Sequence, residues 1–150
     1  MQGFLLEGKF VPKEMSISKD DGCHIYSYFF KPSIPFQQLS RYDKNQIWWL
    51  EHNHHKIQYR DGFLELSNIA DILRKFVNKD TVIYLKGFLK VNYLKTILAN
   101  NVVNLELDIF CPRLAKCNHT CVYHIEPYSA CSTENVKILC KYIQNLQYIE

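Results

Sequence analysis

The chain has 150 residues, the length of a single domain, and its 47% hydrophobic content is enough to build a core without disulfides. With 22% charged residues, the composition is that of an ordinary globular protein and excludes an intrinsically disordered chain. The net charge of +3 permits nucleic-acid binding but is too small to argue for it alone. We therefore expect one domain spanning residues 1–150.

The alternation of apolar and polar residues predicts eight elements. In chain order they are strand 10–19, strand 23–31, helix 37–52, helix 67–77, strand 81–87, helix 88–100, strand 102–107 and helix 133–149. The first two strands form a hairpin through a turn at residues 19–22. Strands that alternate with helices late in the chain predict an α/β fold, a mixed sheet flanked by helices.

The N-terminal segment MQGFLLEGKFVPKE has no basic start followed by an apolar core and a cleavage site, so we expect no signal peptide. No apolar run approaches the length that crosses a bilayer. We therefore expect an intracellular protein, cytoplasmic or nuclear, with no membrane partner. The six cysteines should then stay reduced, which favours metal ligation or burial over disulfides.

The segment CNHTCVYHIEPYSAC, residues 117–131, has the composition of a metal site. Cys121 and His124 are separated by two residues, a spacing that lets one tight turn direct a thiolate and an imidazole at one point. Cys131 precedes the predicted last helix, whose N-terminus favours the thiolate form. Zinc takes four such ligands in a tetrahedron, so a fourth donor is needed.

Three residues are candidates for the fourth ligand: Cys117, His119 and Glu14. Spacing alone favours Cys117, because a local cysteine requires no assumption about the tertiary fold. The competing interpretation of the whole segment is simple burial, since cysteine is a common core residue. For Cys23 and Cys140 we expect burial in the core.

Four blocks of the sequence resemble the Maelstrom domain of germline small-RNA biology and related uncharacterised arthropod proteins. The blocks are FVPKEMSI, NHHKI, VIYLKGFLKVNYL and CVYHIEPYSACSTENVKILCKYI. The resemblance implies an RNase H-like fold descended from DEDDh-type 3′–5′ exonucleases, with a structural zinc ion. It also implies a role in small-RNA or transposon silencing, the setting of the piRNA pathway.

Carried over to this chain, the resemblance implies the zinc ligands Glu14, Cys121, His124 and Cys131. It also places the family's upstream motif histidine at His55. In an RNase H-like fold the first strand and last helix meet at the ancestral active site, which raises Glu14 above Cys117 as the fourth ligand. Cys117 stays the alternative.

The same resemblance bears on catalysis, because DEDDh exonucleases hold two metal ions with four acidic residues. The first aspartate of that set falls on Pro12, the second on Lys90, and the last lies closest to Asn135. Only Glu14 is retained. The resemblance therefore implies a degenerate enzyme without two-metal exonuclease activity.

Single-stranded RNA is the partner that these features favour. Basic residues interleaved with aromatic ones are candidates for its binding, namely Lys56, Arg60, Lys86, Lys90 and Lys95. The competing interpretation is a solvated helix face beside core tyrosines.

Two other functions stay open. A protein-interaction scaffold could use the aromatic segments YSYFFKPSIPF and IWWLEH, where Trp48 and Trp49 cannot share one buried face. Weak metal-independent RNA cleavage could use His55 as general base with Lys90 stabilising charge.

Overall fold

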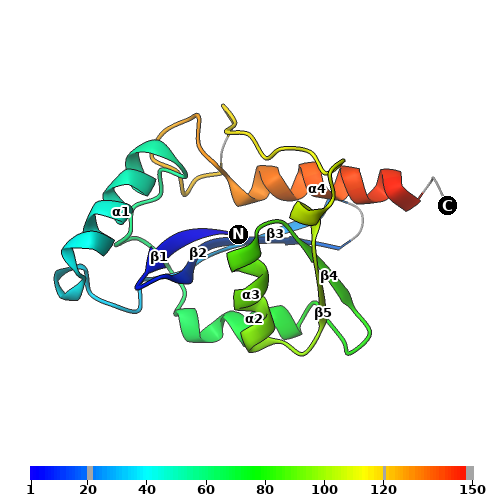
Figure 1. The fold of residues 1–150 in the computed structure, drawn as a ribbon, viewed down its shortest axis with the longest axis horizontal. Coiled ribbons are helices and arrows are strands. Elements are labelled where there is room, and N and C mark those ends of the chain that lie inside the picture. The colour runs from blue at the N-terminus through cyan, green and yellow to red at the C-terminus, as the bar shows by residue number, and fades with distance from the viewer. Residues whose placement is uncertain (20–21, 120, 148–150) are drawn as a thin grey trace. The chain divides into compact units, whose positions relative to one another are not determined.

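The structure is a computed structural model that describes residues 1–19, 22–119 and 121–147. Its strands and helices are β1 (Gln2–Leu6), β2 (Lys9–Ser18), β3 (Ile25–Phe29), α1 (Arg41–Asn53), α2 (Ile69–Arg74), β4 (Val82–Leu85), α3 (Phe88–Ile97), β5 (Asn101–Asn104) and α4 (Ser132–Gln147) (Figure 1). The chain divides into two compact units, Met1–Leu66 with Pro112–Glu150, and Ser67–Cys111. This division does not test the expectation of a single domain over residues 1–150, which stays a prediction.

The first unit is built on an antiparallel sheet in the order β1-β2-β3. The predicted hairpin of β2 and β3 is confirmed; residues 20 and 21 of its turn lie outside the described part of the chain. The sequence did not predict β1, which pairs with β2 through a tight turn at Glu7 and Gly8, both with positive φ. Gly3 interrupts the β1 pattern, and a Cβ there would meet the Val11 carbonyl oxygen at 2.2 Å.

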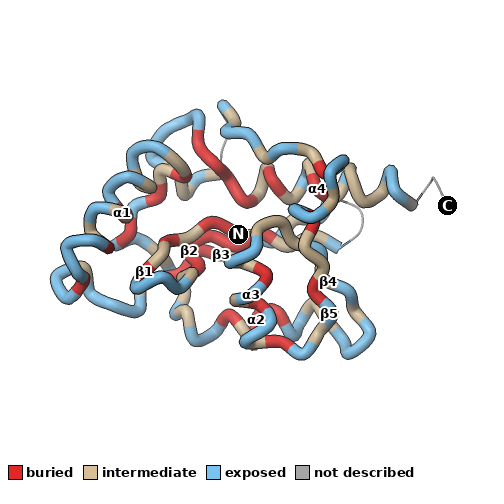
Figure 2. The backbone as a smooth tube through the Cα atoms, viewed as in Figure 1, coloured by how far each residue is buried: buried red, intermediate tan, exposed pale blue. Residues whose placement is uncertain are grey.

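The central strand β2 is buried over its middle residues 12–16, and Figure 2 shows buried backbone in the region of this sheet. On one side, α1 packs against β1 around a core of Phe4, Leu6, Leu39, Ile47 and Tyr59. The helix α4 packs against β2 and β3. The sheet thus packs against α1 at its β1 edge and against α4 at β2 and β3.

Both helices of this unit start at residues that supply capping groups. The Ser40 hydroxyl accepts the Asp43 N–H at 3.0 Å, which caps α1. The Cys131 carbonyl accepts the Asn135 N–H at 3.0 Å and so begins α4. The predicted last helix is confirmed over Ser132–Gln147, and its final residues 148 and 149 lie outside the described part of the chain.

The second unit contains the predicted β-α-β segment, in which α3 connects the parallel strands β4 and β5. The mixed α/β class is therefore confirmed, but the single mixed sheet is wrong for the described residues. The strands form a three-stranded antiparallel sheet and a separate two-stranded parallel one. The four-residue strands β4 and β5 hydrogen-bond to each other, and no described ladder joins them to β1–β3.

Neither of the two cysteines expected in the core is fully buried. Cys23 is exposed rather than buried, because β3 begins only at Ile25 and leaves Cys23 in the preceding bend. Cys140 is half-buried on α4, and Cys111 is buried. Across the described residues, no helix combines the length and apolar character that a membrane span requires.

Candidate metal centre

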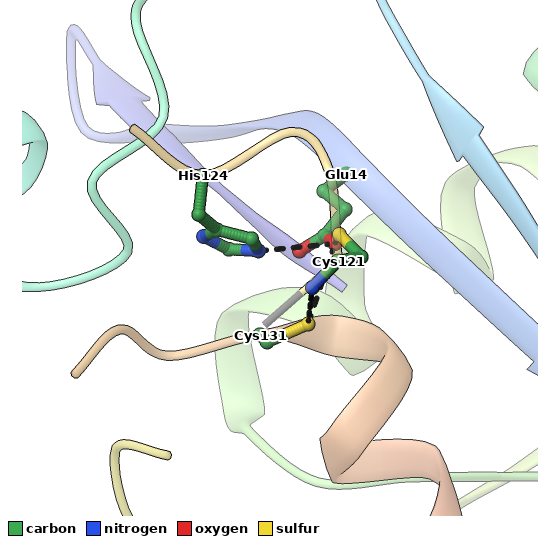
Figure 3. A group of neighbouring side chains, drawn as sticks. All are labelled: Glu14, Cys121, His124 and Cys131. Carbon is green, nitrogen blue, oxygen red and sulfur yellow. Dashed lines mark hydrogen bonds and ion pairs between the residues drawn. The ribbon is translucent and has the colours of Figure 1, made fainter. Parts of the chain in front are cut away.

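Four side chains from three parts of the first unit converge on one point (Figure 3). Glu14 lies on β2, Cys121 and His124 lie on the loop before α4, and Cys131 directly precedes α4. Their donor atoms all lie within 4.8 Å of one another. Among the described residues they form a group that could hold a metal ion.

The local backbone has the two features predicted from the spacing, a tight turn between Cys121 and His124 and a cysteine at the start of the last helix. The His124 N–H donates to the Cys121 carbonyl at 3.3 Å, which closes the tight turn between these two residues. Cys131 lies at the first turn of α4, and the Cys121 N–H points at its Sγ from 3.5 Å. A thiolate there is stabilised by backbone N–H groups and the helix dipole.

Glu14 divides its two carboxylate oxygens between two tasks. Oε2 accepts the Ser132 N–H at 2.9 Å and so satisfies a backbone donor at the start of α4. Oε1 faces the other three donors, at 2.8 Å from Cys121 Sγ, 3.3 Å from His124 Nε2 and 3.8 Å from Cys131 Sγ. The carboxylate is therefore shared between a helix cap and the centre of the cluster.

These distances fit a tetrahedral metal site. Zinc bonds of about 2.0–2.3 Å at tetrahedral angles place neighbouring donor atoms about 3.3–3.8 Å apart. The distances from Glu14 Oε1 to His124 and to Cys131 fall in that interval. The shorter distance to Cys121 is that of a thiol hydrogen-bonded to a carboxylate. The donor set fits a metal ion after small displacements.

His124 is oriented by a backbone group of the segment that follows α1. Its Nδ1–H donates to the carbonyl oxygen of His55, so Nε2 is the nitrogen that faces Glu14. Metal-binding histidines usually have such a carbonyl partner, which fixes the tautomer and the ring orientation. Sequence reasoning missed this role, because a backbone carbonyl leaves no trace in residue type.

The segment around His55 is itself fixed to the metal-site loop. The Ile125 N–H donates to the Lys56 carbonyl and the Ala130 N–H to the His54 carbonyl, both at 3.0 Å. Three consecutive carbonyls, of residues 54–56, thus bind the loop that carries His124. The loop position is therefore defined by the first unit's own backbone.

Hydrogen bonds in the cluster shift the protonation of its members. Burial alone would raise the pKa of Glu14, but the hydrogen bond and charge of His124, with bonds from Cys121 and Ser132, lower that pKa to about 2. Burial alone would lower the pKa of His124, but its hydrogen bonds to Cys131 and Glu14 raise it to about 10. The carboxylate is thus charged and the imidazole protonated at neutral pH.

The two thiols are tightly coupled. A hydrogen bond from the Cys121 thiol lowers the pKa of Cys131, and the same contact raises the pKa of Cys121. Hydrogen bonds among Cys121, Cys131, His124 and Glu14 thus favour protons on Cys121 and His124. A metal ion would take their place, because metal ligation requires the deprotonated forms.

A cluster of hydroxyl groups lies beside the centre, and the sequence analysis did not identify it. Ser16 Oγ is 2.9 Å from Ser27 Oγ and 2.8 Å from Ser132 Oγ, and Thr133 Oγ1 is 3.1 Å from Ser16 Oγ. Since alternate residues of a strand share a face, Ser16 lies on the same face of β2 as Glu14. The cluster joins β2, β3 and the start of α4, and so supports the position of Glu14.

The alternative ligand Cys117 does not belong to the group of four. Its backbone forms an isolated bridge with Ser129, and its thiol lies 3.7 Å from the Ala115 carbonyl oxygen. His119 is exposed. The structure therefore brings Glu14 to the three local donors.

His55, the candidate general base, is completely buried, with 0% of its surface exposed. Its Nδ1 accepts the Ile57 N–H at 3.1 Å, and its ring meets the ring of Phe4 edge-on at 4.8 Å. Burial, with the neighbouring charges of His54 and His124, lowers the pKa of His55 to about 3. The side chain is a neutral core residue.

The basic residues expected to contact nucleic acid are placed differently from one another. In the first unit, Lys56 Nζ donates to Glu126 and to the Pro127 carbonyl, both at 3.0 Å. Arg60 is exposed, and its guanidinium carbon lies 5.0 Å from the centre of the Phe36 ring. Lys56 therefore holds the metal-site loop, whereas Arg60 is accessible to a partner.

In the second unit, Lys86 Nζ donates to the Cys111 carbonyl at 3.3 Å. Burial lowers the pKa of Lys90, and the charge of Glu106 partly offsets this effect. Lys95 is exposed on α3. Of the predicted contacts in this unit, Lys95 is the accessible one.

Glu14 and Cys121, the first two donors in chain order, are 107 residues apart in sequence. A metal ion bound by both would join the N-terminal sheet to the C-terminal helix.

Comparison of the chain with protein-family models, with curated proteins and with solved structures found no match.

Proposed function

We propose that Glu14, Cys121, His124 and Cys131 hold one Zn²⁺ ion that stabilises the fold and takes no part in catalysis. Thiolate and imidazole donors favour zinc over magnesium or calcium, which prefer oxygen ligands. Four protein donors complete a tetrahedron and leave no position for a substrate water. The observation that carries this proposal is the convergence of the four donors within 4.8 Å.

The segment between β5 and α4 explains why the fold would need such an ion. After the short 3₁₀ helix Leu105–Leu107, the described residues up to α4 form no helix or strand, only the bridge of Cys117 with Ser129. A long irregular segment inside a compact fold needs other fixation. Metal binding would supply it, because binding free energy at a structural site becomes folding free energy.

Metal analysis of the purified native protein tests this proposal. We expect about one equivalent of zinc, and loss of that zinc in His124→Ala and in Cys131→Ala. Cys117→Ala is the matched control and should keep its zinc. Less than about half an equivalent in the wild type, or equal loss in Cys117→Ala, would contradict the assignment.

For the biological activity, we propose a Maelstrom-like, RNase H-like module that binds single-stranded RNA and acts in small-RNA or transposon silencing. Support comes from the four sequence blocks and from a donor set of the kind that the resemblance implied. The exposed cations Arg60 and Lys95 add to it. Retention of Glu14 alone from the acidic set supports binding without two-metal cleavage.

The alternative of weak metal-independent cleavage has less support. A general base must come within hydrogen-bond reach of the substrate proton. His55 is fully buried beneath Phe4 and adjacent to the metal centre, so its substitution would disturb the core before any reaction. We therefore assign His55 a structural role in the core rather than the role of a general base.

A mobility-shift titration with labelled single-stranded RNA tests the activity, with single-stranded DNA and duplex RNA as comparisons. We expect binding that weakens as salt rises, because phosphate contacts release counterions. Absence of binding at low salt would refute the RNA proposal. Recovery of a protein partner that persists after nuclease treatment would favour the scaffold alternative.

A further inference from the structure

The solvent-exposed surface of α1 carries three large aromatic side chains. Tyr42, Trp48 and Trp49 are 67%, 58% and 53% exposed, and the two tryptophans are the only ones in the chain. The sequence indicated that these tryptophans could not share a buried face, and both in fact lie in solvent. Side chains of this size normally contribute their area to a core or an interface.

The rings contact neighbouring side chains on the helix or directly after it. The indole of Trp48 stacks on His52, with centroids 4.5 Å apart and planes 24° apart. Trp49 is nearly parallel to His54, with centroids 6.4 Å apart. The Gln46 amide donates to the Tyr42 hydroxyl at 2.6 Å. The face is thus a set of ordered π surfaces, which lowers the entropy lost when a further ring stacks on it.

The charges around these rings favour an anionic partner. Arg41 is exposed at the first turn of α1, and the exposed Lys116 donates to the Asn53 carbonyl at the last turn. The two acidic residues of the helix face inward: Asp43 is buried, and Glu51 accepts the Tyr59 N–H at 2.6 Å. Cations therefore lie at both ends of α1, and none of its exposed side chains is a carboxylate.

We propose that Tyr42, Trp48 and Trp49, with Arg41 and Lys116, form a platform on which unpaired bases of a single-stranded nucleic acid stack. This inference rests on the proposed nucleic-acid function and assigns a surface to it. Bases stack on aromatic rings while phosphates meet nearby cations, the combination found in proteins that bind single strands. A peptide partner would favour apolar neighbours, whereas the other exposed residues of this helix are Asn45, His52 and Asn53.

The dimensions suit a short single strand. The helix Arg41–Asn53 spans about 20 Å. Each phosphate contact on a single strand contributes about −0.7 to the slope of log affinity against log salt. Contacts with Arg41 and Lys116 alone therefore predict a slope of about −1.4, and removal of Lys116 should reduce it by about 0.7.

Intrinsic fluorescence reports on this face directly, because both tryptophans belong to it. We expect saturable quenching when single-stranded RNA of about 12 nucleotides is added to the wild-type protein. The double variant Trp48→Leu/Trp49→Leu keeps apolar area but removes the stacking surface. Measured by anisotropy of labelled RNA, its affinity should fall about tenfold or more, with an unchanged melting temperature.

The control variant Phe110→Ala removes an aromatic side chain that is 79% exposed in the second unit, and its RNA affinity should equal that of the wild type. RNA binding without quenching, and undiminished in the double leucine variant, would overturn the platform and leave the RNA proposal standing. Absence of wild-type binding at low salt would end both. Loss of a co-purified protein in the leucine variant, with RNA affinity retained, would make this face a protein-docking surface and refute the platform.

Discussion

Removal of the metal from the wild-type protein should lower its free energy of unfolding, because the ion binds the folded chain and not the unfolded one. The centre would join Glu14 to Cys121, which are 107 residues apart, and Cys121 to Cys131. Donors so distant in sequence meet only in the folded chain, so the free energy of zinc binding adds to the free energy of folding. Chelation removes this contribution and leaves the hydrophobic core of the first unit in place.

Mass action sets the magnitude. At a free zinc concentration of about 1,000 times the Kd, binding to the folded state contributes about 4 kcal/mol at 25 °C. For a chain of this length each kcal/mol corresponds to about 2–4 °C in melting temperature, so the expected decrease is roughly 8–16 °C. The core around Phe4, Ile47 and Tyr59 should keep the metal-free protein folded at low temperature.

Thermal unfolding followed by circular dichroism measures the decrease, before and after chelation, with zinc content determined on the same samples. Readdition of zinc should restore the original melting temperature, and magnesium should not. Cys117→Ala should show the same decrease on chelation as the wild type, because its thiol is outside the group of four. A decrease of less than about 3 °C after verified zinc removal would refute a stabilising role of the ion.

Three further variants and one change of pH test neighbouring parts of the structure. Glu14→Gln keeps an oxygen for the Ser132 N–H but loses the anionic donor, so competition with a chromophoric chelator should show zinc affinity reduced at least tenfold. Ser16→Ala removes the hub of the hydroxyl cluster and should cost about 1–2 kcal/mol in urea unfolding with zinc retained; zinc loss would contradict a purely supporting role. Acidification should release zinc, because Cys121 and His124 bind metal only when deprotonated, and a zinc content independent of pH down to about pH 4 would contradict the ligand set. Lys56→Ala should leave RNA anisotropy titrations unchanged, since Lys56 is bound to Glu126; a tenfold loss would restore it as a contact.

Residue spacing predicted the local half of the centre, whereas only the resemblance pointed to the distant half. Two residues between Cys121 and His124 define a turn, and a cysteine before a helix is recognisable from the pattern. Glu14 has no such signal, because its contact with Cys121 depends on how β2 meets α4. Spacing alone favoured Cys117, and the resemblance to Maelstrom pointed to Glu14 instead.

The successes and errors of the predicted fold also have physical causes. Helical periodicity predicted α2, α3 and α4 because each buries one apolar face. The strand β1 was missed because Gly3 breaks the pattern that the other strands show, and Cys23 was misplaced because the strand β3 starts two residues later. Tertiary packing decides whether the N-terminal strands and the strands β4 and β5 join into one sheet. The periodicity of the sequence carries no information about that packing.

The strand β2 shows how polar partners, rather than apolar alternation, can specify a buried strand. Lys13 and Glu14 are adjacent, point to opposite faces and are both almost fully buried. Lys13 Nζ donates to the Tyr59 carbonyl at 2.6 Å and to the Asp61 carbonyl, and lies 5.1 Å from the centre of the Phe29 ring. Burial lowers the pKa of Lys13 to about 8, an effect that the charges of Asp61 and Glu51 reduce.

Each of these buried charges is therefore compensated on its own side of the strand. A buried charge that loses its partner costs several kcal/mol, whereas a buried pair contributes little by itself. The Lys13 side of β2 holds the segment after α1, and the Glu14 side holds α4 and the metal-site loop. Because the His55 carbonyl in that same segment orients His124, both faces of β2 act on the one centre. The carboxylate of Glu14 therefore joins the contacts on both faces of β2 to the start of α4 and the metal-site loop.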